Sequence, residues 1–160
     1  MKKDIFIDNN VANKFANPQD KEYKKLTKWL LNFNVDDIEN KNNYAHLVVS
    51  KKLLAEYLSS SIGASSNTAI PMIISTLQRQ GRLVMISNSE IKNFQHKYYK
   101  KTIVNNFRSN SEDREHIPVV LLSDRKYALS YDTNFIHDLE TFPGFNVIVK
   151  KRPEEIPYDK

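Results

Sequence analysis

Residues 4–8 read Asp4-Ile5-Phe6-Ile7-Asp8, a short apolar run that ends on a carboxylate. Such a run predicts a strand. Along the rest of the chain, similar short apolar runs alternate with amphipathic stretches. This alternation is typical of an α/β domain with a largely parallel sheet, because helices then connect successive strands. We therefore expect an α/β protein with a mainly parallel central sheet.

Periodicity and capping residues predict the remaining elements. We expect further strands at residues 46–49, 82–87, 126–131 and 145–149. Predicted helices follow three capping residues, Asp20, Ser50 and Ser89, and the last of these helices reaches about Phe107. Other helices are predicted at residues 68–80, with Pro71 in the first turn and Gly81 as terminator, after Ser111, and at residues 133–140. Residues 36–44 are polar and predict a loop.

The chain has 160 residues, which suits one domain, and no internal repeat or Gly-, Ser- or Pro-rich linker divides it. We assign residues 1–150 to that domain and residues 151–160 to a polar tail that is loose or draped on the surface. The absence of cysteine excludes disulfides, thiol nucleophiles and cysteine zinc sites. No apolar run approaches the roughly 20 residues of a membrane helix, so we expect a cytoplasmic protein without a membrane partner.

Two acids directly follow predicted strands. Asp8 follows Ile5-Phe6-Ile7, and Asp132 follows residues 126–131. In open α/β sheets, ligands bind beyond the carboxyl ends of the strands, so the two carboxylates can converge there. The alternative is ordinary turn chemistry, because Asp is common at strand ends and helix caps.

Asp113 and Glu56 are further acids near apolar faces. If residues 112–122 are helical, Asp113 shares a face with Ile117, Val120 and Leu121. A carboxylate on a buried face is costly unless it is paired, caps the helix or binds a metal, and capping is the main alternative. Pro118 implies that this helix is bent or begins later. Glu56 lies on the flank of its helix's apolar stripe, where a solvated glutamate is the alternative.

Four segments, taken in order, resemble the motifs of the PIN-domain family of nucleases. In the first, a strand leads to Asp8, one further residue and Asn10, and in the second a strand leads into a helix bearing Glu56. In the third, Asp113 opens a helix, and in the fourth Asp132 follows a strand. The resemblance covers about residues 4–149. This sequence departs from the family in having Asn9 where Thr or Ser is usual, and Thr133 and Asn134 where many members carry a second Asp.

The resemblance implies a three-layer α/β/α sandwich with a catalytic pocket of Asp8, Glu56, Asp113 and Asp132. Asn10 and Asn134 would be polar supports. Clustered carboxylates repel one another unless protons or cations neutralise them, and hard oxygen ligands suit Mg²⁺ or Mn²⁺. We therefore expect Asp8, Asp113 and Asp132 to bind the metal, with Glu56 binding through water or positioning the nucleophile. No histidine is assigned a role.

These residues lead to the hypothesis of a metal-dependent endoribonuclease that hydrolyses RNA phosphodiester bonds. The alternative is a catalytically silent PIN-like module that binds RNA or a protein partner. By resemblance, the partners besides RNA are an antitoxin or a larger defence or RNA-processing complex, and a second copy in a homodimer. An aspartyl phosphatase fits less well, because Asp8-Asn9-Asn10 lacks a second Asp.

Substrate binding requires cations and stacking surfaces near the acids. The best candidate is the segment with Lys97, Tyr98, Lys100 and Lys101, followed by Arg108; the alternative is an amphipathic helix whose tyrosines face the core. Lys51, Lys52 and Arg114 lie near the acidic motifs and are further candidates for phosphate contacts. The formal net charge of +5 suits a polyanionic partner and equally suits a solvated, lysine-rich surface.

Overall fold

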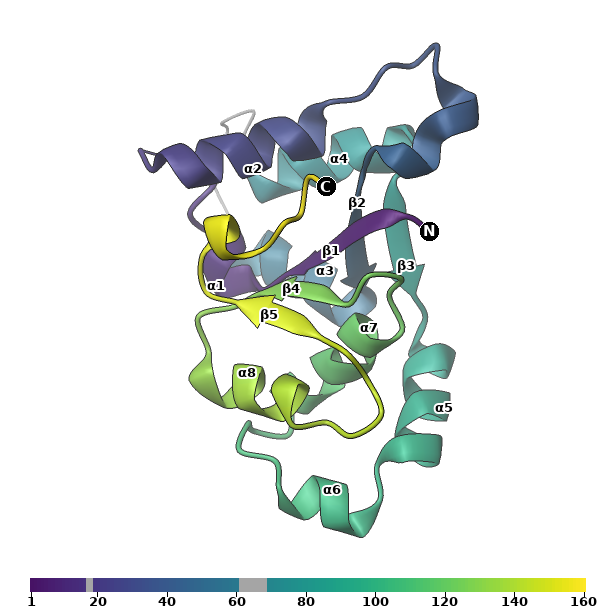
Figure 1. The fold of residues 1–160 in the computed structure, drawn as a ribbon, viewed down its shortest axis with the longest axis vertical. Coiled ribbons are helices and arrows are strands. Elements are labelled where there is room, and N and C mark those ends of the chain that lie inside the picture. The colour runs from purple at the N-terminus through teal and green to yellow at the C-terminus, as the bar shows by residue number, and fades with distance from the viewer. Residues whose placement is uncertain (17–18, 61–68) are drawn as a thin grey trace.

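The computed structural model describes residues 1–16, 19–60 and 69–160. At its centre is a five-stranded sheet of order β3-β2-β1-β4-β5, in which all neighbouring strands are parallel (Figure 1). The strands are β1 (Lys3–Ile7), β2 (Ala45–Ser50), β3 (Leu83–Ile86), β4 (Tyr127–Leu129) and β5 (Ile148–Lys150). The prediction of an α/β fold with a mainly parallel sheet is confirmed.

The first strand of the chain, β1, is the central strand of this sheet. Phe6 pairs with Val48 of β2 on one side and with Ala128 of β4 on the other. Ile5, Phe6 and Ile7 are completely buried. A strand covered on both faces reads as a continuous apolar run rather than as an alternating one, which is the pattern at the N-terminus.

One face of the sheet is covered by the helices α1 (Asn9–Ala12), α2 (Lys21–Leu31), α3 (Lys51–Ser60) and α4 (Ile70–Arg79). Asp20 caps α2 by accepting a hydrogen bond from the Glu22 N–H, and Ser50 Oγ accepts one from the Leu53 N–H in α3. Pro71 lies in the first turn of α4, and Gly81 follows the helix with φ of +66°. These features were predicted, although part of the predicted range, Thr68, lies outside the described residues. The predicted loop at 36–44 contains a 3₁₀ helix, η1 (Ile38–Asn43).

The opposite face is covered by α5 (Asn88–Tyr98), α7 (Ile117–Leu121) and α8 (Thr133–Glu140). The helix α7 packs on β2 and lies between α5 and α8, while α8 also contacts β5. A short helix, α6 (Lys101–Asn105), lies beyond α8 (Figure 1). Helices on both faces of the parallel sheet make a three-layer α/β/α sandwich, as predicted.

The structure corrects two predicted helices. The segment expected to run from Ser89 to about Phe107 begins with a capping box of Ser87 and Glu90, and it breaks at Tyr99, where both adjacent tyrosines pack against Phe94. The helix expected over 112–122 is a 3₁₀ turn, η2 (Asp113–His116), followed by α7. Pro118 explains the later start of α7, because proline is tolerated in a first turn, where its missing N–H is not needed.

The tail at 151–160 is draped over α2 rather than loose. Arg152 Nη2 lies 2.7 Å from Asp20 Oδ2, and the ring centroids of Tyr158 and Trp29 are 5.0 Å apart. A short 3₁₀ helix, η3 (Pro153–Glu155), and the buried Ile156 complete this packing. Within the described ranges, no helix combines the length and the apolar character that crossing a membrane requires.

Candidate functional site

Asp8 and Asp132 lie on the two loops that follow β1 and β4, where the strand order of the sheet reverses. Asp8 directly follows β1, Asp132 lies three residues after the end of the neighbouring β4, and the Asp8 N–H donates to Leu129 O at 2.8 Å. Each also caps a helix: Asp8 Oδ1 accepts from the Asn9 N–H, and Asp132 Oδ1 accepts from the N–H groups that open α8. Capping engages Oδ1 of each carboxylate, and because a carboxylate oxygen can accept more than one bond, turn chemistry and a ligand site are compatible here.

Ser130 and Asn10 connect the two loops. Ser130 Oγ donates to Asp8 Oδ2 at 2.6 Å and accepts from the Asp132 N–H at 3.1 Å. The Asn10 amide donates to Asp8 Oδ2 at 3.4 Å, and its oxygen accepts from the Tyr131 N–H at 3.2 Å. Asp8 is therefore held in position by both strands. Asn134, the other expected support, has an exposed side chain and contributes its backbone N–H.

Glu56 reaches the same region from α3. The buried Tyr57 hydroxyl donates to Ile7 O, which fixes α3 against the end of β1. The Glu56 carboxylate contacts Nε2 of His116 at 3.0 and 3.1 Å. His116 is buried beside the ring of Phe6, at a centroid distance of 5.8 Å, and its Nδ1 has no hydrogen-bond partner among the described residues.

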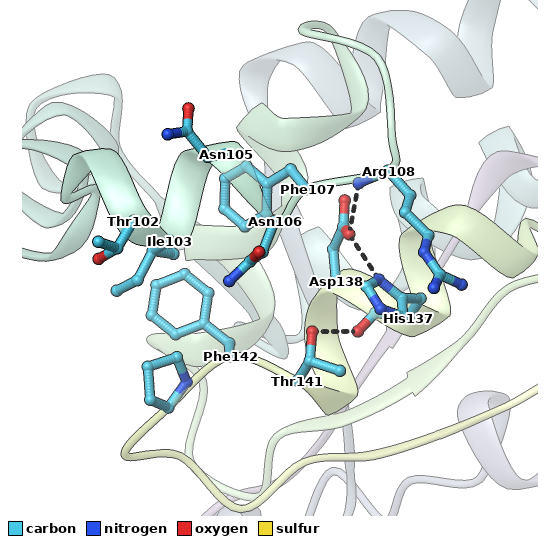
Figure 2. Close-up of a pocket in the computed structure, with 11 residues that line it drawn as sticks. Thr102, Ile103, Asn105, Asn106, Phe107, Arg108, His137, Asp138, Thr141 and Phe142 are labelled. Atoms are coloured by element: carbon cyan, nitrogen blue, oxygen red, sulfur yellow. Dashed lines mark hydrogen bonds and ion pairs between the residues drawn. The ribbon is translucent and has the colours of Figure 1, made fainter.

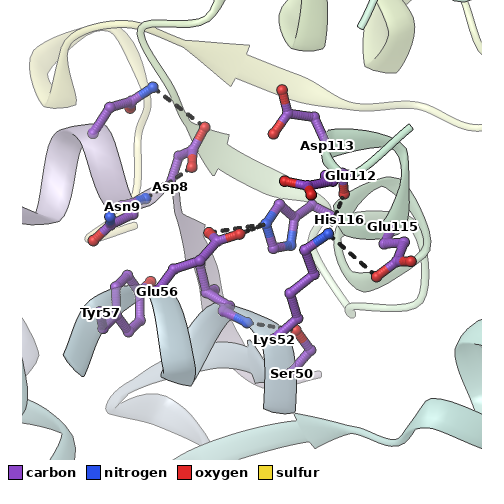
Figure 3. Close-up of polar contacts among 12 residues, drawn as sticks. Asp8, Asn9, Ser50, Lys52, Glu56, Tyr57, Glu112, Asp113, Glu115 and His116 are labelled. Carbon is purple, nitrogen blue, oxygen red and sulfur yellow. Dashed lines mark hydrogen bonds and ion pairs between the residues drawn. The ribbon is translucent and has the colours of Figure 1, made fainter. Parts of the chain in front are cut away.

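Asp113 enters the site from η2. Its N–H donates to Asn110 Oδ1 at 2.9 Å, and its side chain is half-buried. Figure 3 shows the side chains of Asp8, Glu56, Asp113 and His116 pointing toward one another. The predicted helical face shared with Ile117, Val120 and Leu121 does not form, because α7 begins only after His116.

Sequence reasoning missed His116 and Ser130, although each had a signal. His116 lies three residues after Asp113, and side chains at this spacing eclipse one another in a 3₁₀ helix. Ser130 lies two residues before Asp132 at the end of a strand. The spacing of Asp113 and His116 indicates a shared site only if residues 113–116 form a 3₁₀ helix. The spacing of Ser130 and Asp132 does so only if the strand ends at residue 129 rather than 131.

The carboxylates of the site interact electrostatically. Burial raises the pKa of Asp8 and the charge of Glu56 raises it further, while the Ser130 hydrogen bond, His116 and the Asn9 N–H oppose the rise. The pKa of Asp113 is raised by burial and then by the negative charges of Asp132 and Asp8. Such mutual repulsion is relieved when a proton or a cation binds.

The oxygen ligands fit a hydrated hard cation better than a closed metal cage. Within 1–16, 19–60 and 69–160, no three His, Asp or Glu side chains lie close enough together to hold one ion. The expected ligand set of Asp8, Asp113 and Asp132 is therefore not preassembled. Mg²⁺ commonly binds through one or two carboxylates and completes its shell with waters and substrate phosphates. Asp8 and Asp132 provide oxygens of that kind at the switch point.

Two of the three basic residues predicted to contact phosphate, Lys52 and Arg114, contact protein groups in the structure. Lys52 lies 3.3 Å from Glu115 Oε2 and donates to Glu112 O at 2.8 Å (Figure 3). Arg114 Nε donates to Ser109 O at 2.9 Å, and its guanidinium lies over the ring of Phe107. Lys51 is exposed.

Residues 97–101, expected to bind substrate, have an amphipathic arrangement in which the tyrosines face the core and the lysines face solvent. The side chains of Tyr98 and Tyr99 are half-buried against Phe94, with ring centroids 4.6 and 6.3 Å from it. Lys97, Lys100 and Lys101 are exposed.

We expect Ser130→Ala to raise the pKa of Asp8 further, because the Ser130 hydroxyl stabilises the ionised carboxylate. If cleavage requires ionised Asp8, the acidic limb of the pH–rate profile moves to higher pH. Ser89→Ala, which removes an exposed hydroxyl from α5, is the matched control and should leave the profile unchanged. The same acidic limb in wild type and Ser130→Ala would show that Asp8 does not control the rate.

No family model matches the sequence, and no curated protein and no solved structure matches it. The site itself therefore carries the functional proposal.

Proposed function

We propose that this protein is a metal-dependent endoribonuclease of the PIN-like kind, acting at the acidic site formed by Asp8, Glu56, Asp113 and Asp132. The observation that carries the proposal is that Ser130 joins Asp8 and the Asp132 N–H at the switch point between β1 and β4. Ligands of open parallel sheets bind at this position. The sequence resemblance supports RNA as the substrate, and the net charge of +5 is compatible with a polyanion.

Each side chain has a defined role in this mechanism. Asp8 and Asp132 would hold Mg²⁺ or Mn²⁺, which when bound supplies a more acidic water and neutralises charge on the phosphate. Glu56, fixed by His116, accepts a hydrogen bond from the attacking water and orients it toward phosphorus. Asp113 adds negative charge that favours cation binding. Ser130 and Asn10 keep Asp8 in place during hydrolysis.

A second candidate function is a silent PIN-like module that binds RNA or a protein partner. One observation favours it: the part of the chain that the structure describes has no ready three-ligand cluster. The two candidates differ in whether a divalent ion binds and whether RNA is cut.

The proposal is tested by incubating the wild type with labelled single-stranded RNA and Mg²⁺, Mn²⁺ or EDTA. We expect endonucleolytic products with either metal and none with EDTA, because the carboxylates alone do not activate water sufficiently. Isothermal titration with Mn²⁺ should show binding near neutral pH. A folded protein that neither cuts varied RNAs nor binds Mn²⁺ would support the silent module instead.

A further inference from the structure

A cavity lies outside the acidic site, between α6 and the C-terminal half of α8. Its volume is about 650 Å³, within the range of about 300–1,000 Å³ typical of small-molecule sites. Its lining combines apolar side chains with amides and one cation (Figure 2). The lining residues used below are Ile103, Asn105, Asn106, Phe107, Arg108, His137 and Asp138.

Asp138 organises the polar wall of this cavity. Its buried carboxylate accepts hydrogen bonds from the N–H groups of Arg108, at 2.8 Å, and Ser109, at 2.9 Å, and from the Ser109 hydroxyl. His137 Nδ1 lies 3.1 Å from the same carboxylate. Although burial raises the pKa of Asp138, these hydrogen bonds hold it below the ordinary value, so Asp138 is an ionised acceptor.

An ionised acceptor fixes the orientation of His137. Because Asp138 can only accept, Nδ1 is the nitrogen that carries hydrogen, and Nε2 of the neutral ring is then an acceptor. The His137 side chain is 24% exposed, which leaves it accessible from the cavity. A ligand hydroxyl is a suitable donor to Nε2.

The other walls suit the remaining parts of a nucleotide. Arg108 is held through its backbone N–H, lines the cavity and is exposed, and its guanidinium has no ion pair within the described ranges. A guanidinium of this kind suits a phosphate. The half-buried side chains of Ile103 and Phe107 provide apolar surface against a base, and the exposed amides of Asn105 and Asn106 suit its hydrogen-bonding edge.

Two continuous segments connect this cavity with the acidic site. Along α8, Asp132 caps the first turn and His137 lies five residues later, a rise of about 8 Å. Along the other segment, Arg108 is five residues before Asp113, and Asn110 Oδ1 accepts from the Asp113 N–H. A single strand that lies in the acidic site can therefore reach the cavity within a few nucleotides.

We infer that the cavity binds one ribonucleotide of a single-stranded RNA, with Arg108 on its phosphate and His137 Nε2 accepting a hydrogen bond from its 2′-hydroxyl. This inference rests on the proposed function, because it identifies how the same enzyme selects RNA. The 2′-hydroxyl is the group that distinguishes RNA from DNA, so the cavity is a specificity site.

The test is binding without cleavage, measured in EDTA by fluorescence anisotropy. The probes are a labelled 12-nucleotide single-stranded RNA and its 2′-deoxy counterpart of identical base sequence. We expect the wild type to bind the RNA about tenfold more tightly, the effect of one well-formed hydrogen bond. His137→Ala should reduce this preference to nearly one, whereas His96→Ala, at an exposed position of α5, should preserve it.

Arg108→Gln separates the phosphate contact from the sugar contact. We expect this variant to bind both probes about tenfold more weakly while it retains the preference for RNA. The slope of log affinity against log salt should fall in magnitude by about one. Arg79→Gln, an exposed arginine on α4, is the charge-matched control. Because Arg108 is exposed, this variant should fold normally.

The outcomes distinguish this inference from the proposed function. A wild type without RNA preference, or a His137→Ala variant that keeps the full preference, would overturn the inference even if metal-dependent cleavage is present. Loss of the preference in His137→Ala supports the inference, whether or not the protein cuts RNA.

Discussion

Asp8→Asn is expected to lower metal-dependent RNA cleavage by at least about 100-fold. Loss of a residue that supports a metal ligand lowers activity by about 10- to 100-fold, and Asp8 is itself a proposed ligand. Asn keeps the size of the side chain and can still cap α1 through its amide oxygen. The substitution removes the negative charge at the point where β1 and β4 meet. Cleavage assays with Mn²⁺ and titration calorimetry of Mn²⁺ binding measure the effect on the same samples.

This loss of activity should occur without loss of stability. Burial raises the pKa of Asp8 above its ordinary value of 3.8, so the folded protein binds this proton more tightly than the unfolded chain. The free energy of unfolding therefore falls as pH rises from about 3.8 through the folded-state pKa. At neutral pH, Asp8→Asn should be at least as stable as the wild type.

Asp36→Asn is the matched control for Asp8→Asn, because it makes the same change at an exposed position between α2 and η1. Its cleavage rate and Mn²⁺ affinity should equal those of the wild type. If Asp8→Asn cleaves RNA as fast as Asp36→Asn, the assignment of Asp8 to the active site is wrong.

Arg82→Ala is expected to lower the free energy of unfolding by about 3–5 kcal/mol, since it both opens a cavity and leaves buried acceptors unpaired. The Arg82 side chain is completely buried, and Nη1 donates to Leu30 O at 2.8 Å and to Ala45 O at 2.7 Å. Its Nε and Nη2 donate to Gln80 Oε1, and its guanidinium lies 4.9 Å from the ring centre of Phe33. Burial lowers the pKa of Arg82 to about 10, so it is charged at neutral pH.

Urea unfolding followed by circular dichroism measures this change through the midpoint and the slope of the transition. Arg79→Ala removes an exposed arginine three residues earlier and should change the free energy of unfolding by less than about 0.5 kcal/mol. A loss below about 1 kcal/mol in Arg82→Ala would show that the backbone carbonyls find water or other donors when the guanidinium is absent.

The layers of the fold could be predicted because each strand and helix carries a local signal. The run Ile5-Phe6-Ile7 identified the central strand, and Asp20 and Ser50 identified helix starts. The break at Tyr99 could not be predicted, because it depends on tertiary contacts, whereas Pro118 indicates a bend or a later helix start near His116 from the sequence alone. Tyr98 packs on Phe145 and the Tyr99 hydroxyl donates to Arg114 O, and a periodicity analysis of residues 89–107 does not include these partners.

The acids of the candidate site could be predicted from the sequence, but the long-range contacts that hold them could not. Asp8 and Asp132 were identifiable because strand-ending acids of neighbouring parallel strands share one edge. The contact between Glu56 and His116 joins residues 60 positions apart, and only the folded chain shows that α3 and η2 approach each other. The cavity formed by α6 and α8 had no sequence signal, since its lining comes from the segment 102–108 and from the end of α8.

The position of β1 in the middle of the sheet has a consequence for the order of folding. β1 and β2 pair at Phe6 and Val48, whereas the contact between Asp8 and Ser130 joins residues 122 positions apart. Closing the longer loop costs more chain entropy, and such non-local pairings form slowly. The strands β1, β2 and β3 are therefore expected to associate before β4 joins the sheet, and until β4 joins it Asp8 has no Asp132 beside it. Under the proposed function, the active site would therefore be complete only after β4 has joined β1, so a chain with an incomplete sheet would not cut RNA.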